Sequence, residues 1–535
     1  MPDIGRPPGP IGPSQFGVER FTVPAVLDRR AHEFSDRVMM SIAGTPVTFQ
    51  QMRDRSCAAA NVLAELGVAR GDTVALFTAT CPEWVYFWLG AARIGAVTAA
   101  VNAAYKGEFL IHALRLCRAK VVLADVEREP RLREVVDQAA TATTILVVGD
   151  SLADRLARAL TRPPDAAATE PGELAALFFT SGTTGPSKAV ATTWHYLFSA
   201  AGAAAAAWEL GEGDVVWSAM PLFHLSAAPS VLAPMLLGAT TVLAAAFRPS
   251  QVWDEIRHCH ATGFAGAGAM VSMLWNQPPD PRDTRLPLRF ISAAPISADL
   301  YRGIEQRYGV SVVTMYGMTE AFPISFSCVS EGGVPGTSGR ANPAFELRII
   351  DDAGHALPAG AVGEIACRAK SAHVMSDGYV DPEAIDSALS ITPHDEWFRT
   401  GDLGSLDDDG NLTYVDRVKD SLRRRGENVS SVEVETTVMS HPAVLEAAAV
   451  GIPSDLGEDD ILVVVVPRPG AQLEHAELLD FCSARMPYFC VPRYLEIADE
   501  IPKNVIGRVR KDVLRSRGLS PTAWDREAHG YILSR

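Results

Sequence analysis

The residues from 174 to 188 constrain the fold of this chain more than any other stretch. An apolar run, Leu174–Phe179, is followed at once by the loop Thr-Ser-Gly-Thr-Thr-Gly-Pro-Ser-Lys, which ends at Lys188. A short apolar run predicts a buried strand. The loop offers backbone N–H groups, hydroxyls and one cation to an anion, as the phosphates of a nucleotide require. Its spacing is not that of a Walker P-loop. Taken alone, the loop is equally compatible with a flexible polar turn.

The amino-acid composition narrows the kinds of protein that this chain can be. Apolar residues make up 47% and charged residues 21% of the 535 residues, as in a soluble globular protein of more than one structural unit. A net charge of −16 argues against binding to nucleic acid or to an anionic membrane, because both need a basic face. The eight cysteines are scattered without C-x-x-C spacing, which favours reduced thiols in a cytoplasmic protein.

Two stretches invite misreading as targeting or membrane segments. The N-terminus is rich in Pro and Gly and has no apolar core, so we expect a flexible arm over residues 1–20. The segment from Leu225 to Phe247 carries no charge, yet it contains Pro229, Pro234 and Gly238. A buried helix followed by a buried strand explains it better than a membrane span, and we expect no transmembrane segment.

Strand-like and helix-like stretches alternate through the first two-thirds of the chain. Thr73–Phe77, Lys120–Ala124 and Thr144–Val148 are short buried-strand candidates, and helix-like segments such as Glu83–Ile94 lie between them. This alternation predicts parallel sheets covered by helices on both faces. From about residue 335 the strands become shorter and turn dipeptides more frequent, which predicts a small β-rich unit.

Five further segments occur in a fixed order after the loop. They are Pro221–His224, Ser292–Pro295, Tyr316–Glu320, Trp397–Asp402 and Tyr414–Arg417. With them the chain resembles the adenylate-forming superfamily of acyl-CoA synthetases, adenylation domains and luciferases, and within it the crotonobetaine/carnitine–CoA ligase group.

The resemblance implies an α/β fold. A large N-terminal domain of doubly wound sheets would carry a small β-barrel-like subdomain, followed by a smaller α+β C-terminal domain on a hinge. The implied boundaries are an ATP- and substrate-binding adenylation domain over residues 21–418 and a mobile C-terminal domain over residues 419–535. Lys419 would be the hinge.

The resemblance also implies roles for individual residues. Lys188, Thr319, Glu320, Lys419 and Arg508 would be catalytic, with Thr319 on the α-phosphate and Glu320 on Mg²⁺. His224 would border the acyl pocket, together with Ala267, Gly268 and Ser292. The residues implied to bind ATP, with Tyr316 on the adenine and Asp402 on the ribose, are Thr180, Ser181, Gly182, Thr183, Thr184, Ala293, Ala294, Pro295, Tyr316, Gly317, Met318, Asp402, Tyr414 and Arg417.

The implied chemistry explains these residue types. A carboxylate attacks the α-phosphate of ATP, pyrophosphate leaves, and CoA displaces AMP from the acyl-adenylate. Because two anions must approach, the site needs cations, N–H donors and a metal. Glu320 suits Mg²⁺ and Asp402 suits the ribose diol. Each residue alone has an ordinary structural explanation, and only the ordered set favours function. For His224 a polar cap on an apolar segment stays equally open.

The chain departs from the family pattern at Arg508. Relatives carry at this position a lysine that bridges carboxylate and α-phosphate, and Ala189 is a milder departure where glycine is usual. Arginine keeps the charge but replaces a compact ammonium with a wide planar fork. The basic loop Arg423–Asn428 is expected to line the pantetheine channel, as in relatives, or to be a solvated loop.

Three functions remain open at this stage. The first is activation of a small or medium carboxylic acid, including one with a quaternary ammonium, with CoA as co-substrate. The second is activation of nitrite and its transfer to an aryl amine, motivated by the guanidinium fork of Arg508. The third is a degenerate homologue that binds nucleotide without turnover. The intact loop, Glu320 and Asp402 favour the first.

Overall fold

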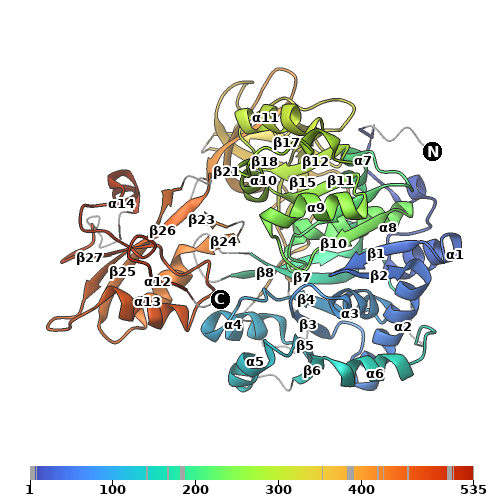
Figure 1. Ribbon diagram of the computed structural model, residues 1–535, viewed down its shortest axis with the longest axis horizontal. Coiled ribbons are helices and arrows are strands. Elements are labelled where there is room, and N and C mark those ends of the chain that lie inside the picture. Colours follow the sequence, from blue (N-terminus) through green and yellow to red (C-terminus); the bar gives the residue numbers. More distant parts are fainter. Residues whose placement is uncertain are drawn as a thin grey trace.

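The computed structural model shows a large α/β domain with a smaller domain beside it (Figure 1). It describes residues 6–7, 9–139, 143–164, 168–180, 187–351, 353–381, 383, 391–417, 421–425, 427–454, 457–502, 509 and 511–533. Within these residues, no helix combines the length and the apolar character needed to cross a membrane.

The first sheet has eight strands in the order β20-β19-β8-β7-β4-β3-β5-β6. Its strands from β7 to β6 pair in parallel, whereas β8, β19 and β20 are added antiparallel to one another and to β7. The predicted apolar run before the phosphate loop is β7. The strand bounds are β3 Thr73–Phe77, β4 Val97–Ala100, β5 Val121–Asp125, β6 Thr144–Val148, β7 Leu174–Thr180, β8 Lys188–Thr193, β19 Gly378–Val380 and β20 Ile391–Thr392.

Helices cover both faces of this sheet because alternate residues of its strands point to opposite sides. In β3, Val74 and Leu76 join one apolar cluster, which includes the residues of α2 and α3, whereas Ala75 and Phe77 join a second cluster, which includes α4 and α5. The helix bounds are α2 Phe49–Glu65, α3 Pro82–Arg93, α4 Gly107–Cys117, α5 Glu129–Val136 and α6 Asp150–Arg158.

The second sheet has seven strands in the order β13-β12-β11-β9-β10-β1-β2, parallel except for the β1–β2 pair. Val216 faces the first cluster and Trp217 the outer cluster under α9 to α11. The bounds are β1 Val38–Ile42, β2 Thr45–Thr48, β9 Val215–Ser218, β10 Thr240–Leu243, β11 Gly263–Ala267, β12 Phe290–Ala294, β13 Ser311–Val313, α1 Arg29–Glu33, α9 Pro249–Cys259, α10 Gly268–Trp275 and α11 Ala298–Tyr308.

Two buried helices, α7 (Trp194–Trp208) and α8 (Ala228–Leu237), pack against each other within the first cluster, which both sheets share. The uncharged stretch after Leu225 is therefore the buried helix α8 and the strand β10, as predicted. The N-terminal segment lies on α7, with Ile11 and Val18 buried. A Cβ on Gly202 of α7 would lie 2.5 Å from the Ile11 side chain, so this close approach requires glycine.

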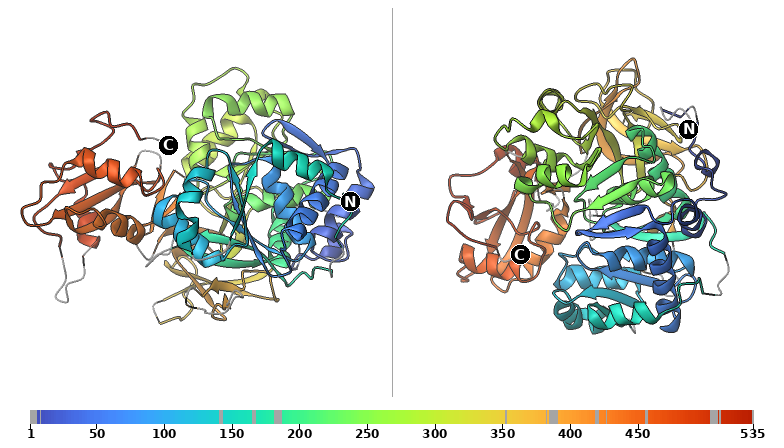
Figure 2. Two further views of the ribbon diagram at one scale, coloured as in Figure 1. Left: turned by 90° about the horizontal axis from the view of Figure 1, so that it is seen from below. Right: turned by 45° about the vertical axis from the view of Figure 1, so that its right-hand side comes forward.

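A β-rich subdomain follows the second sheet, as the turn spacing predicted. It contains a three-stranded and a four-stranded antiparallel sheet, and Figure 2 shows it beside the two larger sheets. The bounds are β14 Met315–Met318, β15 Ala321–Phe326, β16 Arg340–Ala341, β17 Phe345–Ile350, β18 Gly363–Ala369, β21 Phe398–Leu406 and β22 Leu412–Arg417.

The C-terminal part is a smaller α+β unit, drawn in orange and red in Figure 1. A β-hairpin leads into a four-stranded sheet of order β25-β26-β27-β28. The α/β fold with a smaller α+β unit confirms the predicted fold class. The bounds are β23 Ser421–Arg424, β24 Glu427–Ser430, α12 Ser431–Met439, β25 Val444–Pro453, β26 Asp459–Pro467, α13 His475–Ser483, β27 Tyr494–Ile497, α14 Lys511–Arg517 and β28 Trp524–Asp525.

The smaller unit packs against α4 and the segment before it. Tyr105 and Phe109 belong to the same buried apolar cluster as Val434 and Phe489 of the smaller unit. Lys106 adds a polar contact, because its Nζ donates a hydrogen bond to the Ser483 carbonyl oxygen at 2.6 Å.

Candidate active site

One cavity of about 930 Å³ lies where both large sheets, the β-rich subdomain and the C-terminal unit meet. Its walls bring together residues that are far apart in the chain, from Thr180 to Asp459. Most of the predicted site residues that the structure describes line it: Thr180, Lys188, His224, Ala267, Ser292, Ala293, Ala294, Pro295, Tyr316, Gly317, Met318, Thr319, Glu320, Asp402 and Tyr414.

Tyr379 contacts both Lys188 and Glu320. Lys188 begins β8, and Tyr379 on β19 pairs with Val190 two residues further along that strand. The Lys188 ammonium lies 4.6 Å from the centre of the Tyr379 ring, and the Tyr379 hydroxyl donates a hydrogen bond to Glu320 Oε1 at 2.7 Å. One side chain therefore contacts the cation through its π face and the carboxylate through its hydroxyl.

Burial sets the protonation states around this tyrosine. Burial and the nearby Glu320 carboxylate raise the pKa of Tyr379, which keeps its hydroxyl a donor. The ring of His394 meets the Tyr379 ring edge-on at 5.0 Å, and burial lowers the pKa of His394 to about 4. His394 is thus neutral at pH 7 and adds no positive charge beside Lys188.

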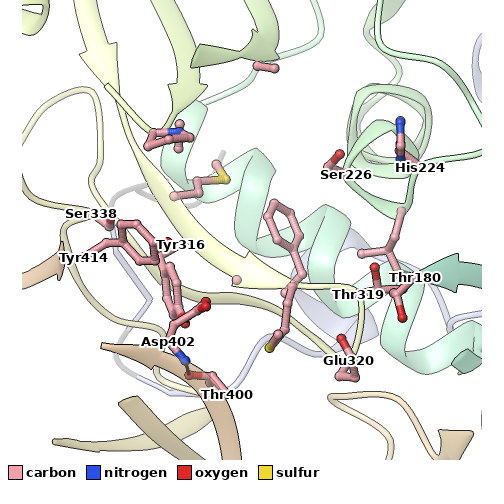
Figure 3. Close-up of a pocket in the computed structure, with 18 of the residues that line it drawn as sticks. Thr180, His224, Ser226, Tyr316, Thr319, Glu320, Ser338, Thr400, Asp402 and Tyr414 are labelled. Atoms are coloured by element: carbon pink, nitrogen blue, oxygen red, sulfur yellow. Dashed lines mark hydrogen bonds between the residues drawn. The ribbon is translucent and has the colours of Figure 1, made fainter. Parts of the chain in front are cut away.

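At the other end of the cavity, Tyr316 and Asp402 form a buried pair. The Tyr316 hydroxyl donates to Asp402 Oδ2 at 2.8 Å, and the Thr400 hydroxyl accepts a hydrogen bond from the Asp402 backbone N–H at 3.1 Å. Burial and the Asp402 charge raise the pKa of Tyr316 far above its usual value, so it stays protonated. Figure 3 shows Tyr316, Tyr414, Asp402 and Thr400 together on one side of the cavity.

Thr180, Thr319, Glu320 and His224 lie on the opposite side of the view in Figure 3. Thr319 and Glu320 occupy the turn between β14 and β15, and Glu320 is buried. The Tyr196 hydroxyl donates to the Thr319 carbonyl oxygen at 3.1 Å, which fixes this turn to α7. The hydroxyls and the carboxylate match the hard oxygen ligands that Mg²⁺ prefers, with water completing its shell.

Gly268, predicted to border the acyl pocket, begins α10 directly after the lining residue Ala267 and is not among the described lining residues. A Cβ on Gly268 would lie 1.8 Å from the Pro295 carbonyl oxygen, so glycine is required for α10 to approach the Ala294–Pro295 turn. Gly268 therefore shapes the wall beside Pro295, and its predicted place in the substrate pocket stays a prediction.

The C-terminal unit lines the cavity with residues of the β25–β26 turn, among them Glu458 and Asp459. Two further carboxylates of this unit contact the large domain. Glu427 lies 2.9 Å from His224 Nε2, and Glu433 Oε1 accepts a hydrogen bond from the Ser187 backbone N–H at 2.6 Å. Burial raises the pKa of Glu433 to about 7. Because His224 lines the cavity and pairs with a carboxylate, it does more than cap the apolar segment that follows it.

Several predicted residues lie outside what the structure describes. These are Ser181, Gly182, Thr183, Thr184, Lys419 and Arg508. For Arg417 the structure describes the backbone alone, which pairs with Asp402 in the β21–β22 register. Their predicted roles stay predictions.

The basic loop Arg423–Asn428 differs from expectation where it is described. Arg424 points into the C-terminal unit, where its Nη1 donates to the Val491 carbonyl oxygen at 2.6 Å and its Nε lies 3.2 Å from Asp460. Arg425 lies 3.6 Å from Glu527. The prediction that this loop lines a channel is therefore wrong for Arg424, whose side chain is 2% exposed.

Sequence reasoning missed Tyr379 and Glu433, and it named Glu427 only as part of the basic loop Arg423–Asn428. Tyr379 stands on a three-residue strand with no pattern of its own, and its partners lie far away in the chain. Glu427 lies in the basic loop and Glu433 follows it, and a surface position is the ordinary expectation for both. All three residues owe their place at the site to contacts between distant parts of the chain, and no local sequence pattern predicts such contacts.

Comparison with known proteins agrees with this architecture. Residues 27–380 match the family model of the AMP-binding enzymes, and residues 433–508 match that of the AMP-binding enzyme C-terminal domain. The chain is 32% identical to a crotonobetaine/carnitine–CoA ligase of Salmonella paratyphi B over 85% of this chain and 90% of that one.

Solved structures show the same fold. The o-succinylbenzoate CoA synthetase of Bacillus subtilis, a double mutant bound to a product analogue, superposes with a TM-score of 0.80 at 25% identity, over 92% of this chain and 98% of that one. ATP-bound MatB of Rhodopseudomonas palustris gives a TM-score of 0.67 at 26% identity, over 92% and 98% of the two chains. The chain is thus an AMP-forming ligase and belongs to the AMP-binding enzyme family.

Proposed function

We propose that this enzyme activates a small or medium carboxylic acid with ATP as an acyl-adenylate and then transfers the acyl group to CoA. The observation that carries the proposal is the convergence of Lys188, Thr319, Glu320 and Asp402 on one cavity of a chain of this family. These residues supply a cation, a hydroxyl, a metal-binding carboxylate and a diol acceptor, which is the set that adenylate transfer requires.

In the first step the acid's carboxylate oxygen attacks the α-phosphorus, the bond to the bridging oxygen breaks, and pyrophosphate leaves. Lys188 would balance charge on the phosphates, and Thr319 and Thr180 would donate hydroxyl hydrogen bonds to them. Asp402, which accepts a hydrogen bond from the Tyr316 hydroxyl, would also accept hydrogen bonds from the ribose hydroxyls. Mg²⁺, held by Glu320, would neutralise the leaving pyrophosphate.

In the second step the thiol of CoA attacks the acyl carbon and AMP leaves. We propose that the C-terminal unit occupies its position for this step, with Glu427 at His224 and Glu433 at the end of the phosphate loop. The TM-scores support this, because the product-analogue complex superposes better than the ATP complex over the same share of the chain, 0.80 against 0.67. A rotated domain lowers such a score without any change of fold.

The test is release of AMP and pyrophosphate across a panel of carboxylic acids, each with and without CoA. The proposal expects an acyl-adenylate with acid alone and sustained AMP release when CoA is added. Nitrite with an aryl amine forms a separate arm. AMP release that requires nitrite and ignores every acid would overturn the proposal, and ATP binding without turnover in any arm would indicate a degenerate homologue.

A further inference from the structure

The last residue of α7 lines one end of the cavity. Trp208 is among the lining residues, yet it is only 3% exposed. Its indole stacks on the ring of Phe290, the first residue of β12, with ring centres 5.7 Å apart and ring planes 15° apart. Both rings belong to the first apolar cluster, so the indole lies between the cavity and the core behind it.

Helix α7 and strand β15 show how far Trp208 lies from the phosphate end of the cavity. Near the start of α7, the Tyr196 hydroxyl donates to the Thr319 carbonyl oxygen. Near its end, the Ala207 carbonyl oxygen accepts a hydrogen bond from the Val329 backbone N–H at 3.0 Å. The helix and the strand therefore run side by side in the same direction. At about 1.5 Å per residue, Tyr196 and Trp208 lie about 18 Å apart along the helix axis, so Trp208 is at the end opposite to the Thr319 turn.

Strand β12 leads to the same depth. It begins at Phe290, which stacks on the indole, and ends at Ala294, which lines the cavity and is predicted to bind ATP. These two residues lie about 13 Å apart along the strand. Five other lining residues belong to the first apolar cluster or pack against it: Met220, Leu225, Ala265, Met315 and Phe322. An acyl group that extends away from the nucleotide along this apolar wall meets the indole at its far end.

The stack behind Trp208 has no room to retreat. Phe290 pairs with Gly263 of the neighbouring strand β11, and a Cβ on Gly263 would lie 2.1 Å from the Phe290 ring. The ring therefore fills the space over this glycine, and the indole lies on the ring. Beyond the ring, Arg289 lies 5.7 Å from the ring centre and its Nη2 donates to Asp214 at 2.9 Å. Because such interiors are close-packed, an acyl chain that is too long cannot push the indole back.

We propose that Trp208 sets the greatest length of the acyl chain that this enzyme activates. This rests on the proposed function and makes it more specific: acyl chains up to the length that reaches the indole are accepted, and longer ones are rejected. Trp208 is thus a specificity-determining residue, and a smaller side chain at this position would deepen the cavity toward Phe290.

The test uses a series of saturated, unbranched carboxylic acids that grow by one CH₂ group at a time. Binding of each acid is measured by calorimetry in the presence of a non-hydrolysable ATP analogue, and kcat/KM for AMP release is measured with ATP and CoA. For the wild type we expect affinity to rise by about fourfold with each buried CH₂ up to a longest acid and then to fall. Binding without turnover would contradict the proposed function, whereas the binding series would still test the length limit.

Trp208→Leu should move the limit to longer acids. Acids just beyond the wild-type limit should gain about tenfold or more in affinity and in kcat/KM, because a single methylene in an apolar pocket discriminates by that much. Trp208→Phe keeps an aromatic ring, so it should give a smaller shift, and it replaces the leucine variant if that variant does not fold. Ala265→Val should shorten the longest acid, because Ala265 of β11 lines the cavity and the added methyl groups narrow it.

Trp217→Leu is the matched control. Trp217 is also buried and stacks on a phenylalanine, Phe264, with ring centres 5.3 Å apart, but it belongs to the outer cluster and is not among the described lining residues. The control should lower the thermal midpoint without changing the longest acid. The same longest acid in the wild type and the Trp208 variants, or an equal shift in Trp217→Leu, would overturn the inference. A wild type that binds no acid of the series would overturn it as well.

Discussion

Tyr379 contacts both charged groups that the proposed chemistry needs, the ammonium of Lys188 and the carboxylate of Glu320. The phenol stabilises the cation through its π face and the carboxylate through its hydroxyl. We therefore regard Tyr379 as a positioning residue for the phosphate end of the cavity.

Replacing Tyr379 by Phe removes the donor to Glu320 and keeps the ring beside Lys188. Hydrogen bonds to charged groups contribute about 1.5–3 kcal/mol, so we expect ATP affinity measured at low Mg²⁺ to fall by about tenfold or more. High Mg²⁺ should restore part of the loss. Titration calorimetry of ATP at several Mg²⁺ concentrations measures this.

Tyr308→Phe serves as the matched control for this substitution. Tyr308 is also buried and its hydroxyl donates to the Leu274 carbonyl oxygen at 3.3 Å, away from the cavity lining. The control should leave the Mg²⁺ dependence of ATP binding unchanged. An equal shift in both variants would show that loss of stability, and not loss of the contact to Glu320, is responsible.

At the scale of elements, the site is shaped by the approach of α10 to the turn after β12. Gly268→Ala places a Cβ 1.8 Å from the Pro295 carbonyl oxygen, and backbone cannot yield as a side chain can. We expect a lower thermal midpoint and weaker ATP binding, because the displaced turn carries Ala293 and Ala294 of the cavity wall. Differential scanning calorimetry and ATP titration measure the two effects.

Gly213→Ala is the control, because a Cβ there meets nothing within 4 Å. It should change neither the midpoint nor ATP affinity. If Gly268→Ala behaves like this control, the wall tolerates more movement than its contacts indicate.

The sequence predicts those helices and strands that a local pattern of residues determines. The run Leu174–Phe179 is part of β7, and the uncharged stretch after Leu225 is α8 with β10, because apolar length and helix-compatible composition decide these segments. Asp402 and Tyr316 could be identified as candidates from ordered motifs. Their hydrogen bond could not, because it depends on how the three-stranded sheet that carries Tyr316 packs against the four-stranded sheet that carries Asp402.

The short strand β19 was beyond prediction for the same reason. Its three residues gain their strand conformation by pairing with β8, which lies nearly two hundred residues earlier in the chain. Likewise Arg424 has the sequence of a solvent-exposed basic loop, and only the fold shows that Asp460 and the Val491 carbonyl oxygen bury it.

At the scale of the whole molecule, Glu427 of the C-terminal unit contacts His224 of the cavity wall. Glu427→Gln should slow the CoA-dependent step by about tenfold or more, since His224 loses the carboxylate that lies 2.9 Å from its Nε2. Formation of acyl-adenylate without CoA should change much less if the two steps use different domain positions. Single-turnover measurements of each half-reaction test this. Equal slowing of both half-reactions would contradict the proposal that the C-terminal unit occupies a different position in each step.

Glu433 makes the same docking dependent on pH. Burial raises its pKa from 4.5 to about 7. The carboxyl therefore holds its proton in the docked arrangement at pH values where an exposed carboxyl has lost it. The docked arrangement is favoured below about pH 4.5 and loses this stabilisation as pH rises toward 7.

Glu433→Gln should remove that pH dependence, because the amide oxygen still accepts the Ser187 N–H and carries no proton to lose. Distance between fluorophores on the two domains, followed from pH 5 to 8, measures the docked fraction. Equal pH profiles for the variant and the wild type would show that another group controls docking. Tyr105 and Cys490, buried beside Glu433 with raised pKa values, stay neutral over this range.

The central claim is that this cavity joins an acid to AMP and then passes the acyl group to CoA. A rapid-quench experiment with ATP, Mg²⁺ and a carboxylic acid substrate, followed by mass spectrometry, tests it most directly. The account predicts that an acyl-adenylate accumulates without CoA and is converted to an acyl-CoA thioester with release of AMP when CoA is added. Hydrolysis of ATP with no acyl-adenylate, or an adenylate that CoA leaves untouched, would contradict it.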